Sequence, residues 1–286
     1  MKTLSIIGSG RVGTALALAL ARKGLSLQYL ADPLLGRARR ARKMIGQGRV
    51  TADNKLAARS AGIIFICVPD DLIPAVVKEL EDLDWQGKYV FHTSGACASD
   101  LLQPLAAKGA KVASFHPAQT FAGESREPGI FQGIYIGLEG QPEAVKLGQK
   151  LAARLGAQTL LLSAREKPLY HLALSLSSNF LIVLLNEAKE LWQASGLEET
   201  TILEILTPLL NKTLQNVKKL GIEPSLTGPV VRGDLETVKK HLALTARHPG
   251  LDRAYRALAL EALKIAGRGG LSPQKVRALK RLLGQK

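Results

Sequence analysis

The fold of this chain is decided by residues 3–24, which read TLSIIGSGRVGTALALALARKG. They predict a short apolar strand, a tight loop with the pattern Gly8-x-Gly10-x-x-Gly13, and a helix of small residues. In that setting the first glycine permits the turn, the second lets the backbone approach a pyrophosphate, and the third lets helix and strand pack closely. The helix N-terminus adds free N–H groups and a positive dipole end. We expect the loop to bind a nicotinamide dinucleotide, NAD or NADP, through Gly8, Ser9, Gly10, Arg11, Val12 and Gly13.

Asp32 ends the second predicted strand, about twenty residues past the last glycine, where an acid binds the adenosine ribose hydroxyls of NAD. The same carboxylate would repel the 2′-phosphate of NADP. Arg37, Arg39 and Arg40 follow on a predicted helix and could turn toward that phosphate. Because Asp32 is held at a strand end before Pro33, whereas an arginine can stay solvated, the sequence favours NAD and leaves NADP as the alternative.

Short β-rich runs alternate with helical stretches up to residue 163, which predicts an α/β fold with a doubly wound, mostly parallel Rossmann sheet. After that point the strand signals stop. The expected strands are 3–7, 26–30, 63–68, 89–92, 111–115, 134–138 and 158–162, and the later helices are 168–195, 198–220, 234–247, 252–265 and 273–283. We therefore expect a dinucleotide-binding domain over 1–163 and a smaller all-α domain, for substrate binding and dimerisation, over 164–286.

The composition of the chain limits which partners it can have. The net charge of +15 comes largely from residues 37–49 and 264–286, and no nucleic-acid motif accompanies these runs. They are typical of solvated faces, so nucleic acid is an unlikely partner, while an acidic small molecule fits a basic surface. The two cysteines offer no disulfide framework and no metal-ligand spacing, so we expect no metal. No signal peptide is evident, and the apolar stretch 172–185 is too short for a membrane span. We expect a cytoplasmic protein without a membrane partner.

Three predicted strand ends carry polar or constrained residues, and ligands bind at such ends in doubly wound sheets. Val68 and Pro69 could line an apolar slot near the nicotinamide ribose, or the acids after them could simply cap a helix. Ser94 could bind cofactor or substrate, or lie in a plain turn. His116 could exchange protons near neutral pH, or form a structural His-Pro turn.

Residues 169–185 predict a helix that is apolar almost all round, as buried helices are. Its polar residues fall along one side and are His171, Ser175, Ser178, Asn179 and Asn186. Buried polar groups need partners, which either a ligand pocket or neighbouring helices would supply. Lys167 just before this helix, and Arg232 on a later glycine-flanked loop, could each neutralise an acidic substituent.

The chain resembles an uncharacterised family that joins a Rossmann-like NAD(P)-binding domain to a C-terminal helical domain of unknown function. The segments that carry this resemblance are, in order, IIGSGRVGTALA, VPDD, HTSGA, SFHPAQTF, YHLALSLSSNF and TGPVVRGDLETVKKHL. More distantly the chain is similar to pyrroline-5-carboxylate reductase, prephenate dehydrogenase and the β-hydroxyacid dehydrogenases. The resemblance implies an NAD(P)-dependent oxidoreductase with a helical domain that dimerises. Many relatives carry Ser-Arg or Asn-Arg after the second strand, whereas this chain has Ala31-Asp32-Pro33.

Together these features predict hydride transfer to or from a hydroxy acid, keto acid or imine, in a pocket at the domain interface of a homodimer. Ser94 and Asn179 would orient the reacting group, His116 or His171 would move the proton, and Lys167 or Arg232 would bind an acidic group. The alternative is a non-catalytic protein that binds NAD(P) and reports redox state to a partner, because a Rossmann domain alone does not determine function.

Overall fold

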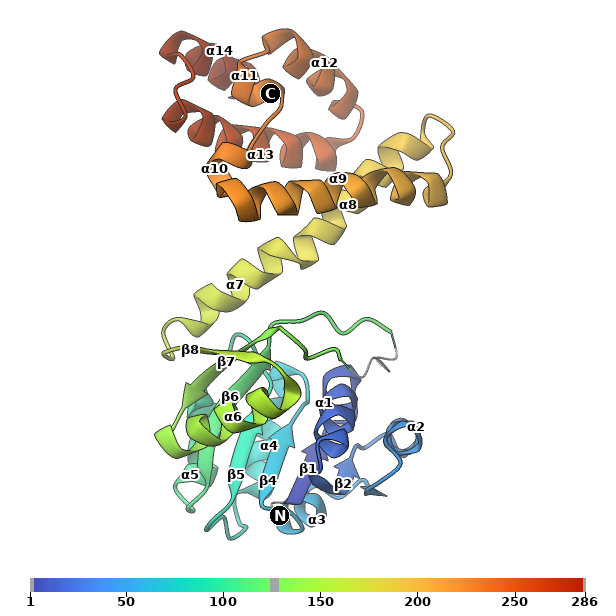
Figure 1. Cartoon of the computed structure of the whole chain (residues 1–286), viewed down its shortest axis with the longest axis vertical. Helices are drawn as coiled ribbons and strands as arrows, with labels where there is room; N and C mark the ends of the chain where they lie inside the picture. The colour runs from blue at the N-terminus through green and yellow to red at the C-terminus, as the bar shows by residue number, and fades with distance from the viewer. Residues whose placement is uncertain (1–2, 124–128, 285–286) are drawn as a thin grey trace. The chain divides into compact units, whose positions relative to one another are not determined.

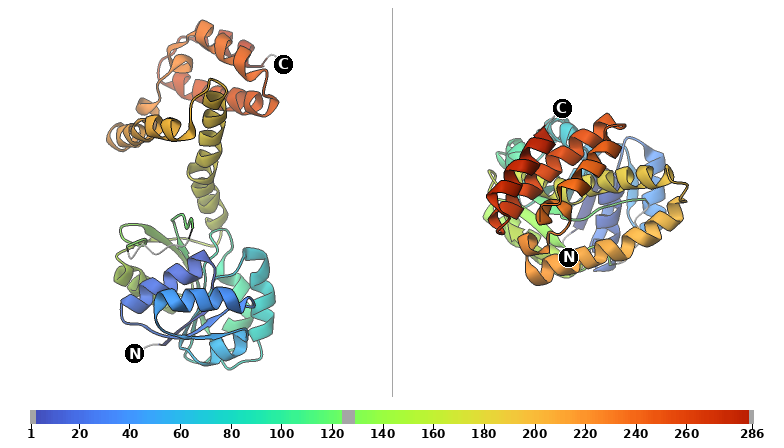
Figure 2. Two further views of the ribbon diagram at one scale, coloured as in Figure 1. Left: turned by 90° about the vertical axis from the view of Figure 1, so that its right-hand side faces the viewer. Right: turned by 90° about the horizontal axis from the view of Figure 1, so that it is seen from above.

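The structure is a computed structural model that describes residues 3–123 and 129–284. It forms two compact units, Met1–Leu181 and Ile182–Lys286, which we describe separately (Figure 1). The first unit contains the sheet, and the second is entirely helical in its described residues. Figure 2 shows both units from two further directions.

In the described residues, eight strands form one sheet in the order β3-β2-β1-β4-β5-β6-β7-β8. The strands are β1 (Thr3–Ile7), β2 (Ser26–Ala31), β3 (Arg49–Thr51), β4 (Ile63–Ile66), β5 (Tyr89–His92), β6 (Lys111–Pro117), β7 (Tyr135–Gly140) and β8 (Gln158–Leu161). Only the β6–β7 pair is antiparallel in this sheet. The predicted fold class is confirmed. The chain order reverses between β1 and β4, and ligands of doubly wound sheets bind at the carboxyl ends of strands at such a switch point.

Helices cover both faces of the sheet. The helices of the first unit are α1 (Arg11–Arg22), α2 (Leu35–Ile45), α3 (Asn54–Arg59), α4 (Ile73–Leu80), α5 (Gln103–Ala106), α6 (Pro142–Leu155) and α7 (Lys167–Ser177). Two short 3₁₀ turns, η1 (Asp70–Leu72) and η2 (Ser99–Leu102), precede α4 and α5. The sequence did not predict β3 or α3, since such short segments carry little periodicity.

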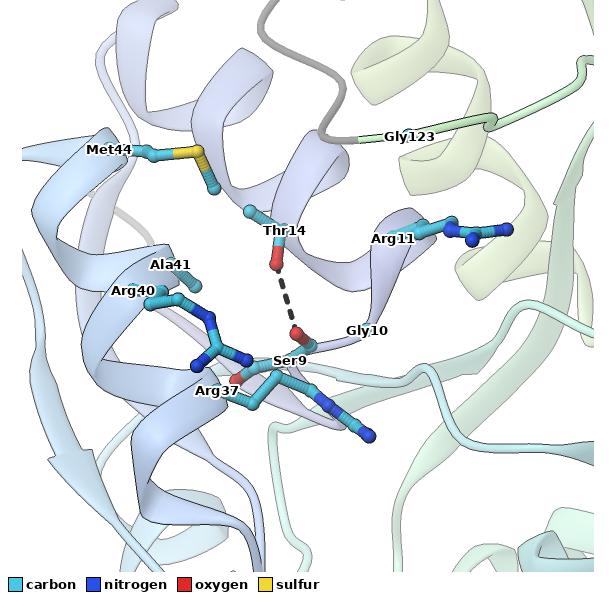
Figure 3. Close-up of a pocket in the computed structure, with 9 residues that line it drawn as sticks. All are labelled: Ser9, Gly10, Arg11, Thr14, Arg37, Arg40, Ala41, Met44 and Gly123. Atoms are coloured by element: carbon cyan, nitrogen blue, oxygen red, sulfur yellow. Dashed lines mark hydrogen bonds between the residues drawn. The ribbon is translucent and has the colours of Figure 1, made fainter.

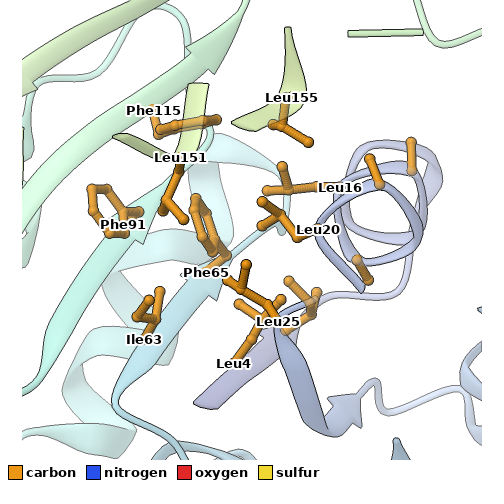
Figure 4. Packing of buried hydrophobic residues seen from close by; sticks show 14 of the residues in the cluster. Leu4, Leu16, Leu20, Leu25, Ile63, Phe65, Phe91, Phe115, Leu151 and Leu155 are labelled. Carbon is orange, nitrogen blue, oxygen red and sulfur yellow. The ribbon is translucent and has the colours of Figure 1, made fainter. Parts of the chain in front are cut away.

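Alternating strand residues build two separate cores. In β4, Ile63 and Phe65 pack on one face with α1 and α6, whereas Ile64 and Ile66 pack on the other with α3, α4 and α5. Figure 4 shows the first of these cores around Phe65. Because neighbouring side chains of a strand point to opposite faces, a strand covered on both sides must be apolar throughout. This explains why residues 63–66 read IIFI.

Helix α8 (Asn179–Gln193) begins in the first unit and continues into the second. The other helices of the second unit are α9 (Glu199–Leu220), α10 (Ile222–Ser225), α11 (Pro229–Arg232), α12 (Leu235–Thr245), α13 (Pro249–Arg268) and α14 (Pro273–Gly284). Its core includes Val238, Leu263 and Leu279. Asp234 caps α12 by accepting a hydrogen bond from Thr237 N at 3.0 Å, as its position before the helix suggested. The sequence placed the domain division after residue 163, where strands give way to helices. The compact units divide after Leu181, because α7 keeps contacts with the sheet.

The apolar helix expected to be buried is exposed, and that expectation was wrong for a single copy of the chain. In α7 and the start of α8, Leu169, Leu172, Leu176 and Phe180 are each more than half exposed. Only Ser178 separates α7 from α8, so the two helices together cover nearly the range 168–195 that the sequence predicted as one helix. By length and composition alone, 167–193 is the one helix among the described residues that could cross a membrane.

Candidate functional site

The glycine loop has the backbone that its sequence predicts. Gly8 has φ of +97°, and a Cβ there would lie 2.5 Å from the carbonyl oxygen of Cys67. A Cβ at Gly13 would overlap the carbonyl oxygen of Gly8, so α1 can approach β1 only without a side chain at this position. At Gly10, in contrast, a Cβ would have no atom within 4 Å. The first and third glycines are therefore needed for the fold, whereas the second borders open space.

That open space belongs to a cavity with a volume of about 570 Å³, the first cavity below (Figure 3). Its lining residues are Ser9, Gly10, Arg11, Thr14, Arg37, Arg40, Ala41, Met44 and Gly123. The N-terminus of α1 opens onto it at Arg11, and the N–H groups and dipole there favour an anion. The described lining combines arginines from α1 and α2 with no acid. The cavity therefore suits a phosphate-bearing ligand.

Asp32 does not line this cavity. Its side chain is only 2% exposed. One carboxylate oxygen accepts a hydrogen bond from Ser9 N and the other accepts one from Leu34 N, both at 2.9 Å. Arg37 Nη1 lies 3.7 Å from the carboxylate. Asp32 thus ties the glycine loop to the start of α2.

The residues present fit a dinucleotide. Ser9 is 2% exposed and lines the first cavity, and among the described residues its hydroxyl has no hydrogen-bond partner. A buried hydroxyl without a partner costs free energy, which marks Ser9 as an energetically unfavourable part of the cavity wall. The space beside Gly10 gives room for that ligand against the backbone.

The second cavity has a volume of about 530 Å³ and lies wholly within the first unit. Its lining residues are Arg11, His116, Ala118, Gln119, Thr120, Phe121, Ala122, His171, Leu174, Ser175, Ser177, Ser178 and Asn179. The tertiary structure thus brings together three predicted site residues, His116, His171 and Asn179. It also adds Arg11, which lines both cavities.

His116 stands at the centre of a small aromatic cluster. Its Nδ1 lies 3.0 Å from the hydroxyl of Tyr170, and its ring centroid lies 6.0 Å from that of His171. A Cβ on Gly95 would come within 2.8 Å of His116 Nε2, so this glycine leaves room for the imidazole. Burial, and then the charge of Lys167, lower the pKa of His116 to about 4. The ring is therefore neutral at neutral pH.

The hydroxyl of Tyr170 lies within hydrogen-bond distance of His116 Nδ1, and the sequence did not identify this residue. Burial raises the pKa of Tyr170 to about 12, so the phenol keeps its proton at neutral pH. Donation of that proton to His116 Nδ1 would place the imidazole proton on Nε2. The only sequence signal was the position of Tyr170 next to His171 in the helix.

Lys167 and Ser94 are joined inside the protein. Lys167 is fully buried, and its ammonium donates hydrogen bonds to the carbonyl oxygen of Ser94, at 2.8 Å, and to the hydroxyl of Ser114. Burial lowers the pKa of Lys167 to about 8. The Ser94 hydroxyl donates to Asp70 at 2.7 Å and accepts from Cys97 N at 2.9 Å. These bonds hold the loop after β5, and neither Lys167 nor Ser94 is among the described residues that line the first or the second cavity.

The remaining predicted residues lie elsewhere. Val68 and Pro69 follow β4, and a Cβ on Gly8 would come within 3.0 Å of Val68 Cγ1. Val12 is half-buried in the first turn of α1. Arg232 ends α11 in the second unit, where its carbonyl oxygen accepts a hydrogen bond from Lys275 Nζ at 3.1 Å.

Comparison with known proteins supports the two-part organisation. Residues 2–117 match a Rossmann-like domain, and residues 134–262 match a domain of unknown function, DUF2520. The expected resemblance is confirmed, and pyrroline-5-carboxylate reductase is among the structural neighbours. No curated protein matches the chain.

Three solved structures share the fold. A Bacteroides fragilis protein named as an NADP oxidoreductase is 22% identical with a TM-score of 0.80, over 92% of this chain and 98% of its own. A reductive aminase from Aspergillus terreus, in complex with NADPH and ethyl-5-oxohexanoate, is 20% identical with a TM-score of 0.63, over 99% and 92%. A pyrroline-5-carboxylate reductase from Coxiella burnetii is 17% identical with a TM-score of 0.60, over 100% and 99%.

Proposed function

We propose that this chain, which joins a Rossmann-like domain to the DUF2520 domain, is an NAD(P)-dependent oxidoreductase acting on a small polar substrate. One observation carries the proposal: Arg11, the first residue of α1, lines both the first and the second cavity described above. A phosphate-binding cavity therefore adjoins a histidine-lined one, as hydride transfer between cofactor and substrate requires.

The cofactor would be held by the glycine loop and the N-terminus of α1, with Gly10 leaving space for the pyrophosphate. Val68 and Pro69, which follow β4 next to Gly8, would line the side of the nicotinamide ribose. When bound, the dinucleotide supplies or accepts the hydride, and the protein contributes orientation and electrostatics. The protein named as an NADP oxidoreductase and the reductive aminase in complex with NADPH have the same fold, which supports this assignment.

The substrate class is a keto acid, a hydroxy acid or an imine. The second cavity combines histidines, hydroxyls and an amide with the guanidinium of Arg11, which can bind a carboxylate through two hydrogen bonds. Arg232 in the second unit is the other candidate for binding a substrate carboxylate, as the sequence suggested. The names of the aminase and of the pyrroline carboxylate reductase support carbonyl and imine chemistry.

His116 would act as a neutral hydrogen-bond donor to the substrate oxygen or nitrogen. Tyr170 holds Nδ1 at 3.0 Å, so the donor is Nε2–H, and a pKa of about 4 keeps the ring uncharged. His171 is the second candidate for moving the proton, and Asn179 would orient the reacting group. Ser94, Asp70 and Lys167 would act as positioning residues, because they hold the loop that packs Gly95 against His116.

The test compares cofactor binding with turnover. Full-length protein is titrated with NADPH and NADH and then supplied with a panel of 2-keto acids, each with and without ammonium or a small amine. We expect substrate-dependent loss of the reduced-nicotinamide absorbance, and a strong decrease in the His116→Asn variant. Tight cofactor binding without turnover of any panel member would favour the non-catalytic redox sensor instead.

We further propose that a second copy of the chain covers the exposed apolar helices. In the second unit, Ile182, Val183, Leu203, Leu209 and Leu214 are each at least half exposed. The first unit adds the exposed leucines of α7. Serines and asparagines interrupt the apolar run of α7 and α8, so a protein partner suits this surface better than lipid. A homodimer would bury it with self-complementary contacts.

A further inference from the structure

The preference between NAD and NADP can be inferred from the surroundings of Asp32. In NAD-binding Rossmann domains an acid at this position accepts hydrogen bonds from the ribose hydroxyls and repels a 2′-phosphate. In this chain both carboxylate oxygens already accept backbone hydrogen bonds, from Ser9 N and Leu34 N. With its side chain 2% exposed, Asp32 is used to hold the loop.

The charge of Asp32 is also compensated. Two N–H groups and the guanidinium of Arg37, 3.7 Å away, surround the carboxylate. The positive charge of Arg37 opposes that of the carboxylate and reduces its field toward a neighbouring anion. The repulsion that would exclude a 2′-phosphate is therefore weak here.

The cavity wall beyond Asp32 is cationic. Arg37 and Arg40 both line the cavity from α2, and Figure 3 shows their side chains reaching toward the loop that carries Ser9. No acid is among the described residues that line this cavity. The Ser9 hydroxyl, buried and without a partner among the described residues, lies at the same wall. Ala41 and Met44 add an apolar surface that suits an adenine ring.

We propose that this chain prefers NADP, with Arg37 and Arg40 binding the 2′-phosphate. This inference rests on the proposed dinucleotide function and names the cofactor of that site. Arginine presents a planar fork of donors that matches phosphate geometry, and its charge does not depend on pH. The arginines determine the preference because both line the cavity, whereas the carboxylate of Asp32 is bonded to backbone N–H groups inside the protein.

The experiment isolates the 2′-phosphate from the rest of the cofactor. The full-length protein is titrated calorimetrically with 2′,5′-ADP and with 5′-AMP, which differ only in that group, and in parallel with NADPH and NADH. We expect each phosphorylated ligand to bind about tenfold tighter or more than its partner, equivalent to about 1.4 kcal/mol.

Two variants, one in the cavity wall and one control, locate the residues responsible for the preference for NADP. Arg40→Ala is the primary variant, since Arg37→Ala also removes the counter-charge of Asp32. We expect Arg40→Ala to weaken 2′,5′-ADP binding about tenfold and 5′-AMP binding less than about twofold. Arg39→Ala is the matched control, because Arg39 lies on the same helix, is exposed and does not line this cavity.

The outcomes separate this inference from the proposed function. If NADH binds as tightly as NADPH, or if Arg39→Ala weakens 2′,5′-ADP binding as much as Arg40→Ala, the assignment of the 2′-phosphate site is wrong while dinucleotide binding stands. If neither NADPH nor NADH binds the unmodified protein, the proposed function itself is wrong.

Discussion

The hydroxyl of Tyr170 lies 3.0 Å from Nδ1 of His116, and the two rings meet edge to face with a centroid distance of 5.6 Å. Tyr170 belongs to α7 and His116 to β6. Burial raises the pKa of Tyr170 to about 12, so the phenol keeps a proton that it can donate to His116. The contact holds the orientation of the imidazole that lines the second cavity.

Replacing Tyr170 with phenylalanine tests this relationship. The variant keeps the ring but loses the donor to Nδ1, so His116 can adopt either tautomer and rotate more freely. We expect kcat on the identified substrate to fall about tenfold or more, with an unchanged Kd for NADPH. A purely structural role would lower thermal stability and leave the kcat of the folded fraction unchanged.

His116→Asn and Asn179→Ala should each suppress turnover while leaving cofactor affinity nearly intact. Loss of one preorganised hydrogen-bond donor at the reacting atom typically costs about 10²–10³-fold in kcat, so the effect should be plain. His241→Asn is a matched control, because His241 makes the same 3.0 Å contact with Tyr255 and lines neither cavity. Full activity of both site variants would make these residues packing groups.

Gly10→Val should abolish dinucleotide binding in a folded protein. A Cβ at Gly10 has no protein atom within 4 Å, so a side chain there extends into the room left for the pyrophosphate. Gly13→Val should instead destabilise the protein, since its Cβ would overlap the carbonyl oxygen of Gly8. Thermal melts and fluorescence titration with NADPH distinguish the two, and unchanged binding by Gly10→Val would disprove the central assignment.

Light scattering should give a mass of about twice 30.7 kDa at micromolar concentration. Leu209→Glu should shift the protein toward the monomer, because Leu209 is 60% exposed among other exposed apolar residues of α9. Leu244→Glu is the control, since Leu244 is equally exposed but belongs to α12. A monomer of the unmodified chain would refute the dimer, and binding to lipid vesicles would point to a membrane instead.

Stability should fall on acidification below about pH 6.5. Burial lowers the pKa of both His92 and His116 from 6.5 to about 4. Between these values the unfolded chain binds more protons than the folded one, so each histidine adds a slope of about 1.4 kcal/mol per pH unit to the unfolding free energy. Urea melts at several pH values measure that slope, and His116→Asn should reduce it. A slope unaffected by this variant would show that His116 titrates normally.

Patterns within a short stretch of chain were enough to predict the sheet, its mostly parallel order and the glycine loop. Apolar strand segments alternate along the chain with helical ones, and Gly8 and Gly13 stand where the local backbone requires glycine. Both features can be read from the sequence directly. The short β3 and α3 and the start of the second unit escaped prediction, because tertiary contacts decide them.

The sequence by itself determined that a dinucleotide-type loop is present and that His116, His171 and Asn179 are candidates for one site. Tertiary structure decided what each side chain does. Asp32 bonds to Ser9 across 23 residues, His116 to Tyr170 across 54, and Lys167 to Ser94 across 73. No local pattern encodes such pairs, since a hydrogen bond depends on where two side chains meet in space. For that reason Asp32, which in the sequence favours NAD, in the folded protein holds the loop beside the arginines.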